Sequence, residues 1–432
     1  MSNKNILSPF QKFVKIESLS GLLLLGATLI ALFWANSSWS DTYYAIWEYK
    51  IGFTSEAFEL NKPLILWVND GLMAVFFFLI GLEIKREFII GELNSAKKVA
   101  FPLFGALGGM LFPVLFYFIL NKNPETIVGW GVPMATDIAF ALAVLKLLGD
   151  KIPLSLKVFL TAFAIVDDIG AVMVIAIFYS ENIQVTLLVI ACIMLLFLYI
   201  LSYKGYYSKF VLFTSGIIIW TLFLKAGIHP TLAGILLAFA IPIRQKASTN
   251  LFIENLESIA KKIKESADLE NPVLSDKQIE EIDNLEDLTE QFQSPLQHLE
   301  HKLHDWVAYF IIPIFALANA GVMLNSDYEL NSALIINLIL CLVLGNSVGI
   351  TFIVFLAKKL KFVQIPKDIN NMHIVGVSFL AGIGFTMAIF IASLAFKNSP
   401  AYIDSAKIGI LLGSLISALI GYIILKLNST KN

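Results

Sequence analysis

The sequence predicts an all-α polytopic membrane protein with twelve transmembrane helices and a short outer β-hairpin. Of its 432 residues, 57% are hydrophobic and 15% are charged, whereas an ordinary globular domain carries about 25% charged residues. The apolar residues gather in runs of about 20, the length that crosses a bilayer as a helix. Lys and Arg concentrate in alternate connections between these runs, which is typical of cytoplasmic loops.

Twelve apolar runs define one membrane domain, although several of them are short or interrupted. Eight runs lie within residues 1–243 and four within residues 306–432. The expected spans are 19–36, 64–82, 98–120, 125–148, 153–179, 184–202, 209–226, 227–243, 306–324, 333–357, 373–396 and 405–426.

The distribution of basic residues predicts the orientation in the membrane. With the N-terminus in the cytoplasm, the inside connections hold 25 of the 31 Lys and Arg residues and the outside connections hold 6. Cytoplasmic loops carry this excess, so both termini are expected in the cytoplasm. No convincing cleavage site follows the first run, so we expect a retained first helix and not a signal peptide.

Two polar segments interrupt the series of spans. Residues 41–62 alternate aromatic and polar side chains around a possible turn, which predicts an outer β-hairpin. The hairpin either pairs with a partner subunit or packs on its own membrane domain. Residues 244–305 hold 14 acidic and 7 basic residues and are expected to form a partly helical cytoplasmic loop.

Composition also excludes some classes of function. The formal net charge is -2 and no arginine-rich tract is present, so no nucleic-acid partner is expected. Cys192 and Cys341 both lie inside apolar runs and are interpreted as small buried hydrophobic residues. No resident cofactor is expected.

Four aspartates lie inside the expected spans: Asp70, Asp137, Asp167 and Asp168. A charged side chain at the bilayer centre costs roughly 2.5–3.5 kcal/mol on insertion scales, so such residues usually line an ion path. For a single aspartate such as Asp70, a carboxylate that only stabilises helix packing is an equal alternative. For Asp167 and Asp168 that alternative is weak, because two neighbouring carboxylates incur the cost twice.

The adjacent aspartates suit an exchange of cations for protons. Neighbouring positions on a helix point about 100° apart, so both side chains can border one aqueous funnel without facing the same partner. Burial and a like-charged neighbour both favour protonation. A carboxylate that holds a proton cannot offer the same lone pair to Na⁺, a hard cation that prefers oxygen. With access from alternate sides, this competition is sufficient for antiport.

Two expected spans, the fourth and the eleventh, look discontinuous. Discontinuous helices place half-helix ends at the bilayer midplane, and Asp137 can neutralise the positive N-terminal ends. Simple close packing of glycines is the alternative. The two spans hold corresponding middle positions if spans three to five are repeated in spans ten to twelve. The interrupting residues are Gly129, Gly131 and Pro133 in the fourth span, and Gly382 and Gly384 ahead of Thr386 in the eleventh.

Charged and titratable residues also gather at the ends of the spans. Two groups lie on the cytoplasmic side, at the end of the second span and just before the ninth. Because histidine titrates near neutrality, these groups together can respond to cytoplasmic pH, although a solvated surface cluster is an equal alternative. His229, at the outer junction of spans seven and eight, either stabilises a turn or takes part in gating. The cytoplasmic residues are Glu83, Lys85, Arg86 and Glu87 at the second span and Glu300, His301 and His304 before the ninth.

Six motifs follow one another along the chain: WVNDGLMAVFFFLIGLEIKREF, ATDIAFALAVL, FAIVDDIGA, GIHPTLAG, FALANAGV and GIGFTMAIFIASLAF. Together they resemble the NhaA family of sodium/proton antiporters, and the resemblance covers nearly the whole chain apart from the acidic loop. It implies a twelve-helix fold with inverted repeats, crossed discontinuous helices four and eleven, and a homodimer with the hairpin at its contact.

The resemblance also implies roles for individual residues. Asp168 matches the principal ion-binding aspartate of the family and Asp167 its partner. Thr136 and Asp137 match the groups at the helix break. The family exchanges more than one H⁺ for each Na⁺ or Li⁺, which makes transport electrogenic. The residues that match the pH-responsive cytoplasmic cluster are Glu83, Arg86, Glu87 and Glu300.

Asn346 departs from the family pattern. Many members carry a lysine here that pairs with the aspartate matching Asp167, whereas this chain reads LVLGNSVGI. Asparagine forms hydrogen bonds but carries no charge. Because an opposite charge favours ionisation, Asp167 is expected to hold its proton more tightly, which predicts activity at higher pH or altered coupling.

Two other functions were compared with antiport. Intramembrane aspartyl proteases also use two buried aspartates, but their Tyr-Asp and Gly-x-Gly-Asp motifs are absent from these spans. A Na⁺-coupled symporter of an organic solute needs further polar or aromatic contacts, and none is evident beside the aspartates. The sequence therefore favours a transporter of Na⁺, Li⁺ and H⁺ in the lipid bilayer over an enzyme.

Overall fold

The structure is a computed structural model, and its described part is almost entirely helical. The described residues are 9–54, 59–91, 94–180, 182–244, 248–266, 273–323 and 329–429. The first elements are α1 (Pro9–Ala35), α2 (Ser40–Glu48), β1 (Lys50–Thr54), β2 (Glu59–Pro63), α3 (Leu64–Leu66), the π-helix η1 (Trp67–Leu72), α4 (Met73–Ile89), α5 (Ala96–Leu120), the 3-10 helix η3 (Ile127–Met134), α6 (Ile138–Leu147), the 3-10 helix η4 (Gly149–Lys151), α7 (Leu154–Phe178), α8 (Val185–Tyr203), α9 (Lys209–Lys225) and α10 (Thr231–Phe239).

The remaining elements include two π-helical segments within longer helices. They are α11 (Thr249–Glu265), α12 (Asp276–Phe292), α13 (Pro295–Trp306), the π-helix η5 (Val307–Ile311), α14 (Ile312–Asn319), α15 (Ser332–Leu340), the π-helix η6 (Cys341–Gly345), α16 (Asn346–Lys359), α17 (Asn371–Leu380), α18 (Phe385–Ala395) and α19 (Pro400–Ser429).

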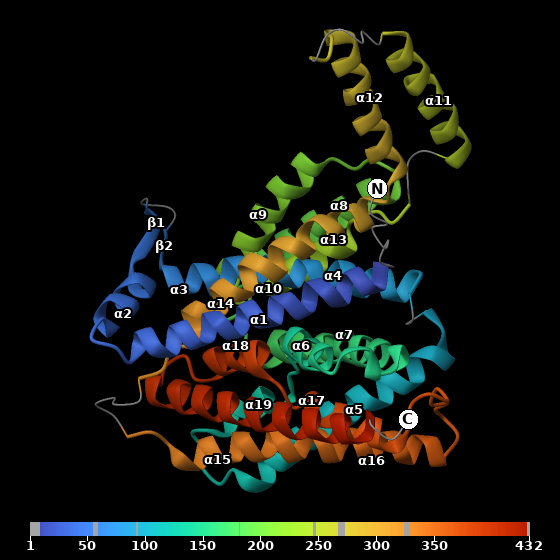
Figure 1. The fold of residues 1–432 in the computed structure, drawn as a ribbon. Coiled ribbons are helices and arrows are strands. Elements are labelled where there is room, and N and C mark those ends of the chain that lie inside the picture. Colours follow the sequence, from blue (N-terminus) through green and yellow to red (C-terminus); the bar gives the residue numbers. More distant parts are fainter. Residues whose placement is uncertain are drawn as a thin grey trace.

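Figure 1 shows the helices packed into one bundle, with their axes mostly along a common direction. The β1–β2 hairpin lies at one end of the bundle, and both marked chain ends lie at the other. The hairpin is antiparallel, with Lys50 opposite Pro63. Residues 40–48 form α2, so the strand expected to begin near residue 41 begins at residue 50. Tyr43 and Trp47 are four residues apart and both pack against the same cluster, which is helical spacing and not strand spacing.

The structure does not confirm the predicted number of spans. In the described part of the chain, seven helical stretches are long and apolar enough to cross a membrane, or up to nine if each of two bent pairs is one span. The expected spans 209–226 and 227–243 are helical, but their main helices have only 17 and 9 residues. The expected span 306–324 is formed by η5 and α14, which continue directly from α13. The fold is therefore polytopic and helical, and the number twelve remains a prediction.

Glycines allow the backbones of two helix pairs to touch. A Cβ atom on Gly108 of α5 would lie 2.4 Å from the carbonyl oxygen of Gly349 on α16, and one on Gly349 would lie 2.3 Å from that of Gly108. In the second pair, a Cβ atom on Gly234 of α10 would lie 2.2 Å from the carbonyl oxygen of Ala74 on α4. Small residues at such contacts are the usual way for membrane helices to associate.

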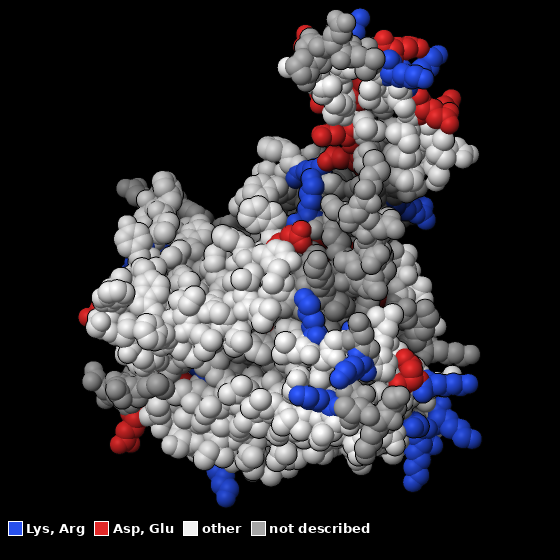
Figure 2. Space-filling model, in the orientation of Figure 1, with Lys and Arg blue, Asp and Glu red and all other residues white. Residues whose placement is uncertain are grey.

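Apolar side chains cover the outside of the bundle. Most residues of α8 are exposed, including Ile193, Leu196 and Phe197 at about 60% each, as expected for a helix that faces lipid. Figure 2 shows a largely uncharged body, with most Lys and Arg near the end that carries the chain termini and on a projecting arm. This distribution supports the predicted orientation.

The projecting arm is formed by α11 and α12, which lie within the expected acidic loop. Figure 1 shows both helices extending away from the bundle. Phe252 and Phe292 stack with ring centroids 4.1 Å apart, and Lys262 pairs with Glu281 at 3.0 Å. The two helices therefore stabilise each other, while α13 continues from the arm back onto the bundle.

Candidate functional site

Two helices are broken inside the bundle, close to the expected positions. The first break comprises residues 135–137, between η3 and α6, and the second comprises residues 381–384, between α17 and α18. The glycines and proline of the first segment do not form the break itself, because residues 127–134 form the 3-10 helix η3. The backbone N–H of Asp137 donates to the carbonyl of Ile383 at 2.6 Å, so the two breaks meet.

Asp137 stabilises the N-terminal ends of both half-helices. One carboxylate oxygen accepts a hydrogen bond from the backbone N–H of Phe140 at 3.1 Å, in the first turn of α6. The other oxygen accepts from the backbone N–H of Thr386 at 3.1 Å and from its hydroxyl at 2.5 Å, at the start of α18. A negative charge at helix N-termini is favourable. The expected role of Asp137 therefore has the right geometry.

The glycines of the second break allow close approach. A Cβ atom on Gly384 would lie 2.9 Å from the carbonyl oxygen of Ala135, and one on Gly382 would lie 2.3 Å from the carbonyl oxygen of Leu342 in η6. Larger residues at these positions would push the break away from the first break and from η6.

Thr136 connects the first break to the aspartate pair. Its backbone N–H donates to Oδ2 of Asp167 at 2.9 Å, and its hydroxyl donates to the carbonyl of Ala381 at 2.8 Å. Asp167 is 1% exposed, whereas Asp168 is 9% exposed. Asp168 is thus the more accessible of the two, in line with the different roles expected for them.

Asn346 lies next to the same break. It is fully buried, and its side-chain nitrogen donates to the carbonyls of Pro133 at 3.1 Å and Leu342 at 3.4 Å. Oδ1 of Asn346 and Oδ1 of Asp167 are both buried with no hydrogen-bond partner in the described part of the chain. The sequence identified both residues but not these two oxygen atoms.

Asp70 and His229 form a separate site. Oδ2 of Asp70 accepts from Lys62 on β2 at 2.9 Å, and Oδ1 lies 3.8 Å from Nε2 of His229. Nδ1 of His229 lies 2.7 Å from the hydroxyl of Thr231. The ion pair with Lys62 links the β-hairpin to the membrane helices. No sequence pattern predicted this pair, because the two residues lie on different elements.

The residues of the predicted cytoplasmic cluster lie close together. Arg86 donates to Glu300 at 2.5 Å and to Glu87 at 2.8 Å, and Glu83 is close enough to interact electrostatically with Arg86. Glu300 is 9% exposed. Burial raises the pKa of Glu300 above its ordinary value, although the positive charge of Arg86 acts in the opposite direction.

Lys85 has a structural role that the sequence did not reveal. Its ammonium donates to the carbonyls of Phe239 at 2.7 Å and Ile241 at 2.5 Å, at the C-terminal end of α10. A cation is favourable at that end of a helix. Lys85 therefore ties α4 to α10 beside the Arg86 cluster.

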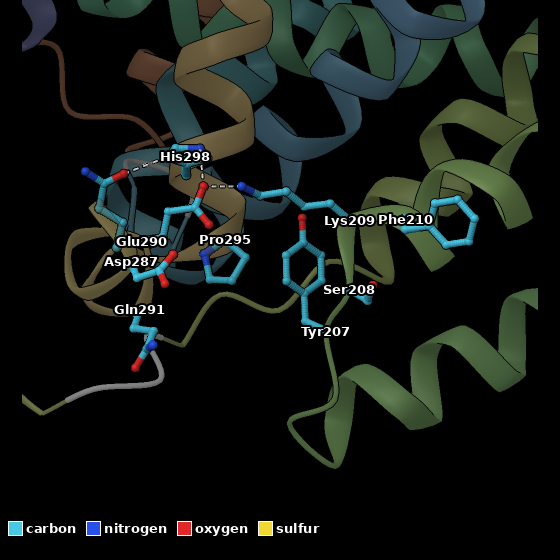
Figure 3. Close-up of a pocket in the computed structure, with 10 residues that line it drawn as sticks. Tyr207, Ser208, Lys209, Phe210, Asp287, Glu290, Gln291, Pro295 and His298 are labelled. Atoms are coloured by element: carbon cyan, nitrogen blue, oxygen red, sulfur yellow. Dashed lines mark hydrogen bonds and ion pairs between the residues drawn. The ribbon is translucent and has the colours of Figure 1, made fainter. Parts of the chain in front are cut away.

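A cavity of about 390 Å³ lies where the α11–α12 arm joins the bundle. Figure 3 shows Lys209 of α9 and His298 of α13 directed towards Glu290 of α12. Lys209 pairs with Glu290, and Nε2 of His298 lies 3.9 Å from the same carboxylate. These residues were not expected to be functional, and the cavity contains none of the predicted site residues.

Comparisons with known proteins agree with the geometry. A sequence model of the family described as Na⁺/H⁺ antiporter 1 matches residues 11–425. A protein of Oleidesulfovibrio alaskensis named Na(+)/H(+) antiporter NhaA is 45% identical over 424 residues, covering 98% of this chain and 94% of that protein. The chain is 42% identical to Na(+)/H(+) antiporter NhaA 1 of Saccharophagus degradans, covering 97% and 91% of the two chains, and 42% identical to Na(+)/H(+) antiporter NhaA of Shewanella frigidimarina, covering 95% and 94%.

Proposed function

The chain belongs to the NhaA family of Na⁺/H⁺ antiporters, and from this premise we propose that it exports cytoplasmic Na⁺ or Li⁺ in exchange for external H⁺. Na⁺/H⁺ exchange is the activity of the family. The proposed location is a bacterial inner membrane with both termini in the cytoplasm. The concentration of Lys and Arg near the end that carries both termini supports this orientation.

The proposed ion site is formed by Asp168 and Asp167 beside the two helix breaks. The observation that carries the proposal is the hydrogen bond from the backbone of Thr136 to Asp167 at 2.9 Å, because it joins the aspartate pair to the broken segments. Asp168 is the more accessible carboxylate and is the proposed point where Na⁺ and H⁺ compete for the same lone pairs. Thr136 and Asp137 hold the break in place around them.

Alternating access is proposed to use an inverted repeat with twelve spans and two crossed discontinuous helices. Bonds at the contact between the breaks, such as those from Asp137 to Ile383 and from Thr386 to Asp137, support this arrangement. In transporters of this type, substrate sites lie at discontinuous helices near the midplane, and one repeat moves against the other around them. Such a movement would expose Asp168 first to one side and then to the other.

The cytoplasmic cluster is the proposed regulator of activity by pH. Since the pKa of Glu300 is raised by burial, its neutral form persists to higher pH than that of an exposed glutamate. Ionisation of Glu300 as the pH rises would add a negative charge to a cluster that already contains Glu83 and Glu87. The position of α13 against α4 would then change, which couples cytoplasmic pH to the membrane helices.

We further propose that transport is electrogenic. Two neighbouring carboxylates can release two protons for one Na⁺, so each cycle would move net charge. We also propose that the protein is a homodimer. The β1–β2 hairpin projects from the bundle with all residues of β1 exposed, which leaves it available for a second copy.

Reconstituted vesicles test the activity. Purified protein in proteoliposomes that contain a pH-sensitive dye should dequench the dye when NaCl or LiCl is added, without any organic solute. Asp168→Asn should abolish this response while the protein still elutes as a folded species. A silent wild type combined with an active Asp168→Asn variant would overturn the assignment.

A further inference from the structure

The side chain of Asn346 is held in one orientation by its surroundings. Its nitrogen donates to two carbonyls, those of Pro133 and Leu342. Rotating the amide by 180° would place its oxygen against these carbonyl oxygens, and acceptor would then face acceptor. Oδ1 therefore points away from both carbonyls and accepts no hydrogen bond from the described residues.

A second unpartnered acceptor is attached to the same short segment. Oδ1 of Asp167 is also buried without a partner among the described residues, while Oδ2 is fixed by the backbone of Thr136. Asn346 and Asp167 thus hold the two ends of the segment Pro133–Thr136. Gly109 of α5 lies beside both Asn346 and the helix that carries Asp167. A Cβ atom built on Gly109 would lie 3.4 Å from Oδ1 of Asn346 and 3.2 Å from the ring of Phe163, which is one turn before Asp167 on α7.

A third unpartnered oxygen lies at the second break. The hydroxyl of Ser417 is buried without a partner in the described part of the chain. It would lie 2.7 Å from a Cβ atom on Gly382, a position that is also 2.3 Å from the carbonyl oxygen of Leu342, which accepts from Asn346. Buried polar atoms are nearly always satisfied in folded proteins, so these three oxygen atoms at the two breaks are available to a further partner.

The chemistry of these atoms selects a cation. An amide oxygen and a carboxylate oxygen are acceptors, and hard cations bind oxygen ligands of this kind. The described part of the structure places no Lys or Arg in an ion pair with Asp167. A cation arriving there would therefore meet oxygen atoms and no competing ammonium group.

From these observations we propose that Oδ1 of Asn346 is a direct ligand of the transported Na⁺, acting with Asp167 at the inner end of the site that Asp168 opens. The inference rests on the proposed antiport function and deepens it, because it makes Asn346 a residue that determines cation affinity. A lysine at this position would supply a positive charge in place of an oxygen ligand, so this chain differs from lysine-bearing members in how it binds the ion.

The test compares the full-length protein with two variants that both lose the amide donor to Pro133 and Leu342. Asn346→Leu has a similar shape but also lacks the oxygen, whereas Asn346→Asp retains an oxygen at Oδ1, so the difference between the two variants reports the oxygen. In proteoliposomes, Asn346→Leu should raise the KM for Na⁺ on the order of 10- to 100-fold, the loss typical of a disturbed metal site. The maximal rate should change much less, because the lost contact is made in the ground state. Asn346→Asp should keep a low KM, and the ratio of the KM values for Na⁺ and Li⁺ should change only in the leucine variant.

Ser347→Ala is the matched control. Ser347 is buried beside Asn346, but its hydroxyl donates within its own helix to Val343 at 2.6 Å. Its removal should leave the KM for Na⁺ unchanged. If the leucine variant does not fold, Asn346→Ala replaces it with the same expected result. If the variant without the oxygen, Asn346→Leu or its replacement Asn346→Ala, keeps the wild-type KM for Na⁺, Oδ1 does not bind Na⁺ and the proposal is wrong.

Thermal unfolding in detergent separates this inference from the proposed function. A ligand that binds only the folded state raises Tm, so NaCl should raise Tm relative to choline chloride in the wild type and in Asn346→Asp but not in Asn346→Leu. This measurement needs no transport. Inactive vesicles with an intact Na⁺-dependent Tm shift would refute the antiport assignment and leave Asn346 as a ligand, whereas an equal shift in Asn346→Leu would refute the ligand role alone.

Discussion

Thr386 and Asp137 lie on different broken helices, and the hydroxyl of Thr386 donates to the carboxylate of Asp137 at 2.5 Å. The bond crosses from the start of α18 to the start of α6. It is accompanied by a bond from the backbone N–H of Thr386 at 3.1 Å, so one carboxylate neutralises two helix ends. The carboxylate of Asp137 therefore adds to the contact between the breaks, which also includes the bonds from the backbone of Asp137 to Ile383 and from the hydroxyl of Thr136 to Ala381.

Replacing Thr386 tests this contact. Thr386→Val keeps the shape and removes the hydroxyl, and a hydrogen bond to a charged group contributes about 1.5–3 kcal/mol. We expect a lower Tm in detergent and slower Na⁺-driven proton movement. Thr386→Ser, which retains the hydroxyl, should restore most of both. Equal behaviour of the valine and serine variants would show that the hydroxyl is unimportant.

Asn346→Lys tests the departure from the family pattern. A lysine ammonium near Asp167 favours the ionised carboxylate, so the pH profile of transport should move towards lower pH and its voltage dependence should change. The measurement is dye dequenching across pH, with and without an imposed membrane potential. If neither the pH profile nor the voltage dependence moved, the absence of the lysine would have no effect on coupling.

Glu300→Gln tests regulation by pH. The pKa of Glu300 is raised by burial, so in the folded protein its neutral form is favoured at low pH and its charge appears only as the pH rises. Glutamine mimics the neutral form at every pH, and the rise of activity with pH should therefore shift to more alkaline values or disappear. The measurement is the initial rate of Na⁺-driven dequenching at a series of pH values.

Glu290→Gln provides the matched control for Glu300. Its carboxylate is exposed, and the hydrogen bond from Lys209 lowers its pKa, so it is already ionised where Glu300 titrates. Its replacement should leave the pH profile unchanged. Identical shifts in the two variants would point to a general effect of charge removal and not to the Arg86 cluster.

Glycine substitutions test the packing of α5 on α16. Gly108→Ala forces a Cβ atom to within 2.4 Å of the carbonyl oxygen of Gly349, and overpacking of this kind costs about 1–3 kcal/mol. We expect a clearly lower Tm. Gly26→Ala is the control, because no atom lies within 4 Å of its Cβ position and alanine favours a helix over glycine by about 0.5–1 kcal/mol. Equal Tm values for the two variants would contradict the close contact.

The sequence predicted the parts of the site that depend on strong local signals. Asp137, Asp167 and Asp168 stand out because a carboxylate in an apolar run is costly, and the breaks were expected from glycine and proline. The exact place of the first break was not predictable, since a 3-10 helix over residues 127–134 has the same composition as an interrupted α-helix.

Contacts between distant elements were beyond sequence reasoning. The pairing of Lys62 with Asp70 and the bond from Asn346 to Pro133 depend on how helices pack, and nothing in the local pattern specifies them. The helix α2 was missed for another reason: Tyr43 and Trp47 share a helical face, but aromatic residues also favour strands. Short helices such as α10 appeared as full spans because hydropathy counts apolar residues and not helical turns.

The backbone contacts at Gly108 and Gly234 have a mechanical consequence. Helices whose main chains touch cannot slide past each other without separating, so we expect α5 with α16, and α4 with α10, each to move as one rigid pair. A rocking motion of the protein would then change the distance between the two helix pairs and not the distances within each pair. Two spin labels on the same helix pair should keep a constant distance when Na⁺ is added, whereas the distance between labels on different pairs should change.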